Sequence, residues 1–195
     1  KDLFVTNGLR KDVLNNDFIA GFDQELAEMN TQFVNLAPVE AEQMLEKMPS
    51  EKVSNYMFHN KGDLTFQNKA ADWGLNEATF SNGAAYADLD NDGDLDLILN
   101  NLDDFASIHE NHTDPSKNGF LRVKIQGSKQ NPFGLGTKVT LYDSERQQFQ
   151  QLSATRGYQS SVETIVHFGI GSSSEIDSIR VEWFDGKVTL LKNVA

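Results

Sequence analysis

Cysteine is absent from the 195 residues of this chain. Its absence excludes disulfide bonds, iron–sulfur clusters and thiolate zinc sites. Long apolar runs are also missing, because no stretch approaches the ~20 residues that a membrane-spanning helix needs. Basic residues are outnumbered, with 17 lysines and arginines against 29 aspartates and glutamates and a formal net charge of −12. Such a surface repels phosphate backbones, so we expect no nucleic-acid binding, and it favours cations.

The acidic residues are most concentrated in one nine-residue segment, Asp88-Leu89-Asp90-Asn91-Asp92-Gly93-Asp94-Leu95-Asp96. Carboxylates on alternate residues of a curled loop converge on one point, and Ca²⁺ takes oxygen ligands at ~2.3–2.6 Å. Gly93 permits the positive φ that turns the chain. Without a cation the five carboxylates repel one another. The spacing predicts a calcium site with side-chain ligands from Asp88, Asp90, Asp92 and Asp96 and a backbone carbonyl from Asp94.

This loop differs from the calcium loop of an EF-hand. An EF-hand has a bidentate Glu at its twelfth position, whereas the twelfth residue counted from Asp88 is Leu99. The flanking sequences also have strand character rather than helical character. Mg²⁺ is less suited, because it retains its waters and seldom takes an all-protein cage. The alternative is a metal-free, solvated acidic hairpin.

Residues 9–53 have a helical pattern. Apolar residues recur there at steps of three or four, at Phe18, Ile19, Phe22, Leu26 and Met29. A second run begins at Pro38, which suits a first helical turn, and Pro49 ends it. We predict two amphipathic helices as an insert, with apolar stripes that pack on a neighbouring sheet.

The rest of the chain is predicted to be mainly β. Residues 54–119 contain a hairpin around Asn60-Lys61-Gly62-Asp63 and the strands that flank the aspartate loop. A linker-like composition at 114–119 indicates a domain boundary. Apolar and polar residues then alternate, as in Leu121, Val123 and Ile125 and again from Ile179 to Trp183, and Asp185-Gly186 predicts a tight hairpin. Residues 120–195 are therefore predicted to form a small antiparallel β-sandwich or barrel.

An internal repeat links the two ends of the first part. Asp2-Leu3-Phe4-Val5-Thr6-Asn7 matches Asp96-Leu97-Ile98-Leu99-Asn100-Asn101. Because Asp96 closes the aspartate loop, residues 1–8 are predicted to be the exit strand of an equivalent loop that begins before Lys1. Repeated β units of this kind indicate a propeller or solenoid, of which this chain is expected to be a fragment.

Two family resemblances agree with these patterns. The run from Ser81 to Ala87, followed by the aspartate loop, resembles an FG-GAP or VCBS-type repeat; the resemblance implies a partial integrin-like β-propeller with Ca²⁺ held by Asp88, Asp90, Asp92, Asp94 and Asp96. The C-terminal part resembles the ASPIC/UnbV domain that follows such repeats in bacterial relatives of cartilage acidic protein. Its matching stretches are 131–139, 157–161, 167–171 and 181–187. The family usually has Pro where this chain has Phe184.

Catalytic motifs are not recognisable in the sequence. Gly134-Leu135-Gly136-Thr137-Lys138 lacks the spacing of a phosphate-binding loop, and Ser160-Ser161 has no nucleophile elbow. We therefore predict a calcium-stabilised, non-catalytic binding or adhesion module, secreted or on the outer cell surface, with an unknown protein or glycan ligand. The alternative is a non-catalytic part of a secreted carbohydrate-active enzyme whose active site lies in blades outside this sequence.

Overall fold

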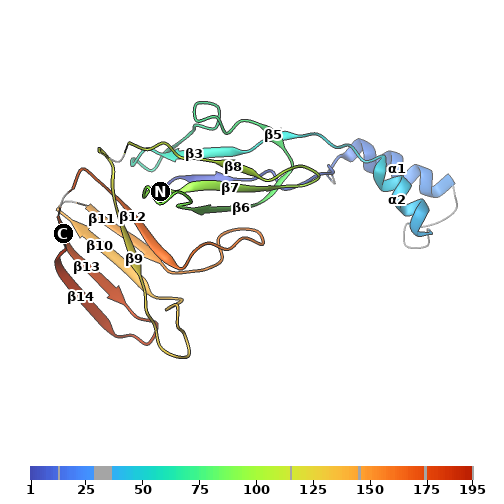
Figure 1. Ribbon diagram of the computed structural model, residues 1–195. Coiled ribbons are helices and arrows are strands. Elements are labelled where there is room, and N and C mark those ends of the chain that lie inside the picture. The colour runs from blue at the N-terminus through green and yellow to red at the C-terminus, as the bar shows by residue number, and fades with distance from the viewer. Residues whose placement is uncertain (13, 29–36, 115, 145, 174, 195) are drawn as a thin grey trace. The chain divides into compact units, whose positions relative to one another are not determined.

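The computed structural model describes residues 1–12, 14–28, 37–114, 116–144, 146–173 and 175–194. It is mainly β, as predicted, with several antiparallel sheets and two helices among these residues (Figure 1). The chain forms two compact units, residues 1–82 with 101–105, and residues 83–100 with 106–195. No helix in the described ranges is long and apolar enough to cross a membrane.

The first unit contains two small sheets, with strand orders β1-β3-β4 and β2-β5, and both helices. Its elements are β1 (Leu3–Val5), α1 (Asn16–Glu28), α2 (Pro38–Glu46), β2 (Val53–Ser54), β3 (Tyr56–Asn60), β4 (Phe66–Asn68) and β5 (Ala78–Thr79). The predicted hairpin around Asn60 is present, because β3 pairs antiparallel with β4. Leu64, however, lies in its turn with a φ of 65° and a side chain that is 97% exposed.

The two predicted helices form where their signals lie. Asn15 caps α1, since its Oδ1 accepts a hydrogen bond from the Phe18 N–H at 2.9 Å, and Pro38 is the first residue of α2. The prediction that the apolar stripe packs on a sheet is wrong for α1, because α1 has no buried residue. Phe18 instead stacks on Phe22, with ring centroids 5.7 Å apart. Met29, the last member of the stripe, lies outside the described residues.

The sequence repeat has a counterpart in strand register. β7 (Asp96–Asn101) pairs antiparallel with β8 (Ser107–His109), and β1 pairs in the same way with β3. Asp2 Oδ1 accepts the Asn60 N–H, and Asp96 Oδ1 accepts the Asn111 N–H, both at 2.9 Å. The donor has the same place in both copies. Leu3 pairs with Phe58, two residues before Asn60, and Leu97 pairs with His109, two residues before Asn111. The two helices therefore lie in the connection between two paired strands.

The second unit contains β6 (Ser81–Ala87) from Gly83 onward, most of β7, β8 and six later strands. The later strands are β9 (Gly119–Lys124), β10 (Lys138–Asp143), β11 (Arg146–Gln151), β12 (Ile165–Gly171), β13 (Ile176–Glu182) and β14 (Val188–Val194). They form a four-stranded sheet of order β11-β10-β13-β14 and a two-stranded sheet of β12 and β9. The tight hairpin at Asp185-Gly186 is confirmed, with the Trp183 N–H donating to the Lys187 carbonyl at 2.8 Å.

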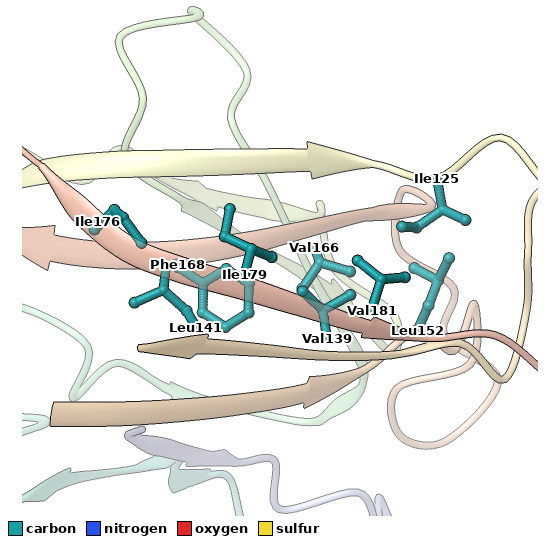
Figure 2. Packing of buried hydrophobic residues seen from close by; sticks show 9 residues of the cluster. All are labelled: Ile125, Val139, Leu141, Leu152, Val166, Phe168, Ile176, Ile179 and Val181. Carbon is teal, nitrogen blue, oxygen red and sulfur yellow. The ribbon is translucent and has the colours of Figure 1, made fainter. Parts of the chain in front are cut away.

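The core of this unit lies between the strands of the two sheets. Figure 2 shows nine buried side chains directed toward one another, from Ile125, Val139, Leu141, Leu152, Val166, Phe168, Ile176, Ile179 and Val181. Leu121, Val123 and Trp183 pack against this cluster, which confirms the predicted alternation in β9 and β13. The period of two thus places every second residue of these strands in the core.

The sheets of this unit do not close into a barrel in the described residues. Glutamine side chains fill the gap between β11 and β12. The Gln148 side-chain amide donates to the Gly169 carbonyl at 2.7 Å, and the Gln150 amide donates to the His167 carbonyl. These side chains satisfy the carbonyl groups of β12 that a neighbouring backbone strand would otherwise pair.

The core can be tested by one truncation and a matched control. Phe168 is fully buried, whereas Phe149 on β11 is 51% exposed. We expect Phe168→Ala to lower the free energy of unfolding by about 3–5 kcal/mol, because transfer and cavity terms add, and Phe149→Ala to lower it by less than about 1 kcal/mol. Urea denaturation followed by tryptophan fluorescence measures both. Equal effects of the two substitutions would contradict this core.

Independent folding of residues 120–195 is a second expectation. All nine buried apolar residues of the cluster lie in this range, so the segment contains its own core. We expect the isolated segment to show cooperative thermal unfolding and a β-type circular dichroism spectrum. Non-cooperative unfolding of the segment, beside cooperative unfolding of the same strands in the full chain, would refute independent folding.

Candidate metal centre

The aspartate loop connects β6 to β7, two neighbouring strands of one antiparallel sheet. Two residues in the loop have left-handed backbone conformations, Asn91 with a φ of 64° and Gly93 with a φ of 95°. Asp90 Oδ1 accepts the Asp92 N–H at 3.2 Å, and Asp92 Oδ1 accepts the Asp94 N–H at 3.0 Å. These turns, in which a side chain binds the backbone two residues on, curl the loop so that alternate side chains face one side.

Three of the predicted ligands come together. Asp88, Asp90 and Asp92 each offer a carboxylate oxygen, and these oxygens lie within 4.8 Å of one another. Asp88 is almost fully buried, with 1% of its side chain exposed, while Asp90 and Asp92 are exposed. One buried and two exposed carboxylates therefore lie together in the loop.

Two carboxylate oxygens of the loop are buried without a hydrogen-bond partner. One is Oδ1 of Asp88, a member of the triad, and the other is Oδ1 of Asp94. A buried, unpaired carboxylate oxygen costs free energy unless a cation or a donor satisfies it. Burial raises the pKa of Asp94, and the charges of Asp92, Asp96 and Asp90 raise it further, against the opposing hydrogen bond from Thr113. The chemistry of these oxygens fits a hard divalent cation such as Ca²⁺.

Asp96 anchors the loop. Its Oδ2 accepts the Leu89 N–H and its Oδ1 accepts the Asn111 N–H, both at 2.9 Å. Asp94 has a related contact, since its Oδ2 accepts the Thr113 N–H at 2.9 Å. Each carboxylate oxygen has a second lone pair, so the same residues can also face an ion. The spacing predicted a ligand from the backbone carbonyl of Asp94, and the family resemblance implied Asp94 as a ligand; in the structure Oδ1 of its side chain is also buried.

Residues outside the loop complete its surroundings. An Arg122 Nη1–H donates to Asp88 Oδ2 at 3.0 Å, and Nη2 contacts both oxygens of Glu163 at 3.2 and 3.0 Å. The ring of Phe120 lies against Gly93, where a Cβ atom would approach its Cε1 to 1.8 Å. Gly93 is thus required both by its φ and by the ring above it. Nothing in the sequence indicated that Arg122 and Phe120 contact the loop, because they belong to a strand about 30 residues further along the chain and match no motif.

Comparison with known proteins gives two matching families. Residues 50–99 match the FG-GAP-like repeat, and residues 127–195 match the ASPIC and UnbV family. The first match contains the whole aspartate loop, and the second covers β10 to β14.

Individual relatives match about half of the chain. Cartilage acidic protein 1 of Xenopus tropicalis is 36% identical over 110 residues, which are 54% of this chain and 16% of that protein. The Homo sapiens protein of the same name is 33% identical over 117 residues, 58% of this chain and 17% of its own length. The matched region thus spans about a sixth of these relatives. Residues 50–99 of this chain are therefore similar to an FG-GAP-like repeat and residues 127–195 to the ASPIC and UnbV family, and about half of the chain is similar to cartilage acidic protein 1.

Proposed function

We propose that the loop from Asp88 to Asp96 binds one Ca²⁺ ion, and that the ion stabilises an extracellular, non-catalytic binding module. The observation that carries the proposal is the pair of buried, unpartnered oxygens on Asp88 and Asp94 beside the Asp88, Asp90 and Asp92 triad. Asp88, Asp90, Asp92, Asp94 and Asp96 are the proposed protein ligands, and water completes the shell.

Calcium is the ion that the chemistry favours. The donors are all oxygens and there is no cysteine in the chain, so the site does not suit soft metals. Several neighbouring carboxylates on one loop match the variable coordination of Ca²⁺ better than the strict octahedron of Mg²⁺. An extracellular location agrees with this choice, because weak loop sites of extracellular modules are filled at about 10⁻⁴–10⁻³ M.

A non-catalytic role is supported by the two families, neither of which is typically catalytic. The relatives named cartilage acidic protein 1 also support an extracellular setting. We propose a protein or glycan on a cell surface or in an extracellular matrix as the ligand. Calcium would contribute by holding the connection between β6 and β7 in one conformation for recognition.

We also propose that the repeat is one blade of a larger propeller. The strand pairing of β1 with β3 repeats that of β7 with β8. Leu3 and Val5 lie opposite Phe58 and Tyr56, and Leu3, Val5 and Tyr56 are each at least 39% exposed. A neighbouring blade would cover such an apolar sheet face.

Calcium should stabilise the chain. We expect the melting temperature to rise on titration of Ca²⁺ into chelator-treated protein, by the equivalent of about 2.7 kcal/mol when free Ca²⁺ reaches 100 times its dissociation constant. Asp90→Ala should remove most of this rise, because it deletes an exposed ligand without opening the core. Asp72→Asn, which changes an exposed aspartate outside the loop, is the control. A melting temperature that does not depend on Ca²⁺ in the unsubstituted protein would refute the site.

Ligand binding should depend on the ion. We expect an array of glycans and extracellular matrix proteins to retain the chain in 1 mM Ca²⁺, about the concentration at which such sites fill, and to lose it with Asp90→Ala or a chelator. Parallel hydrolysis assays on the retained glycans should show no turnover. Retention unchanged by both treatments would separate ligand binding from the metal centre, and turnover would refute the non-catalytic assignment.

A further inference from the structure

Three contacts join the region around the aspartate loop to the C-terminal strands, all within the second compact unit. Ser160 Oγ accepts the Ala84 N–H at 3.1 Å, and a Cβ on Gly83 would lie 3.0 Å from the same oxygen. Arg122 binds Asp88, and the Phe120 ring covers Gly93. The contacts therefore involve the strand that leads into the loop, its first aspartate and its glycine.

Arg122 contacts only one of the two carboxylate oxygens of Asp88. Its guanidinium binds Oδ2, while Oδ1 of the same carboxylate is buried and has no hydrogen-bond partner. Because Nη2 of the same guanidinium is held by Glu163, the hydrogen bond from Nη1 to Oδ2 has a fixed direction and restricts rotation of the buried Asp88 carboxylate. Only 1% of the Asp88 side chain is exposed, so solvent competes little with Arg122 for this carboxylate.

The charge of Arg122 does not oppose a cation strongly, because two carboxylates flank it. Glu163 contacts Nη2 through both oxygens, and Asp88 contacts Nη1. The trio carries a net negative charge, and its field at the site attracts a cation. We therefore expect Arg122 to raise the affinity for the ion by orienting Asp88 more than it lowers that affinity by electrostatic repulsion.

Phe120 acts without any charge. Its ring stacks on His167 of β12, with centroids 5.7 Å apart and planes 8° apart, and it also contacts Gly93. The ring thus lies between the C-terminal strands and the point where the loop turns. A loop that leaves its bound shape would lose this contact as well as the Asp88 pair.

We propose that Arg122 and Phe120 are positioning residues of the calcium site, and that ion binding and docking of the loop on β9 and β12 are coupled. This inference rests on the proposed calcium site. By linkage, an ion that favours the docked loop stabilises β9 and β12, and contacts from these strands raise the affinity for the ion by the same factor.

Calorimetric titration of Ca²⁺ into the full chain tests the coupling. We expect Phe120→Ala and Arg122→Lys each to weaken binding about fivefold or more, within the usual range of coupling between sites. Arg122→Lys preserves the charge but loses the fork, so a purely electrostatic role predicts no change for it. Phe149→Ala and Arg180→Lys, on β11 and β13, are matched controls that should bind Ca²⁺ as the unsubstituted chain does.

Amide hydrogen exchange gives a second readout that a general loss of stability does not reproduce. In the unsubstituted chain, Ca²⁺ should slow exchange in β9 and β12 more than in β13 and β14. Phe120→Ala should remove this difference at saturating Ca²⁺, while its circular dichroism spectrum stays that of a folded chain. Arg122→Lys gives the same test if Phe120→Ala does not fold.

The outcomes separate the two proposals. Absence of binding heat in the unsubstituted chain removes the calcium site and the coupling with it. Binding heat with equal affinities in all variants, or with no slower exchange in β9 and β12, leaves the calcium site intact and overturns the coupling. Tighter binding by Arg122→Gln than by the unsubstituted chain would show that repulsion exceeds positioning, and would overturn the role of Arg122.

Discussion

Mutual repulsion among the aspartates between Asp88 and Asp96 is the constraint on which the arrangement around the loop depends. Backbone N–H groups compensate part of it. Asp96 accepts two of them and Asp94 accepts one, from residues at the start of the loop and from the segment after β8. Arg122 compensates Asp88. What remains is a buried oxygen on Asp88 and another on Asp94. The folded chain thus satisfies several carboxylate oxygens of the loop by its own donors and leaves these two buried oxygens without a hydrogen-bond partner.

The same compensation ties the repeat to the domain that follows it. The residues matched as an FG-GAP-like repeat end at Leu99, yet the partners of its aspartates come from Asn111, Thr113 and Arg122. The compact unit that contains the loop accordingly includes residues 106–195. A family boundary drawn from sequence therefore divides a region that is continuous in its hydrogen bonds and ion pairs. The predicted boundary at 114–119 concerns independent folding of the C-terminal core, which is a separate property.

The C-terminal strands contact the aspartate loop through residues outside their apolar core. The core of nine apolar side chains lies between Ile125 and Val181 in the sequence, while β9 and the loop that carries Ser160 place polar and aromatic groups against β6 and the aspartate loop. Under the proposed calcium binding, groups already held on a packed core would lose little entropy when the ion binds.

The sequence by itself determined the local features of this protein. Period-two alternation fixed the core faces of β9 and β13, since successive strand residues point to opposite sides, and Asn15, Pro38 and Asp185-Gly186 set helix starts and a hairpin. The aspartate spacing and Gly93 predicted the turns of the loop, because these turns are closed by hydrogen bonds between residues two apart. Local patterns, however, wrongly predicted that the apolar stripe of α1 packs on a sheet. They also left open whether the C-terminal sheets close into a barrel.

Tertiary structure decided which groups meet across long stretches of chain. Arg122 contacts Asp88 across 34 residues, and Phe120 covers Gly93. It also decided that Gln148 and Gln150 bridge β11 and β12. No periodicity encodes such contacts, because they depend on strand register and sheet packing, which are set by the whole core. The sequence therefore predicted the loop but not the residues that contact it. The alternation in a strand predicts which face of the sheet a side chain lies on, but not which residue lies opposite.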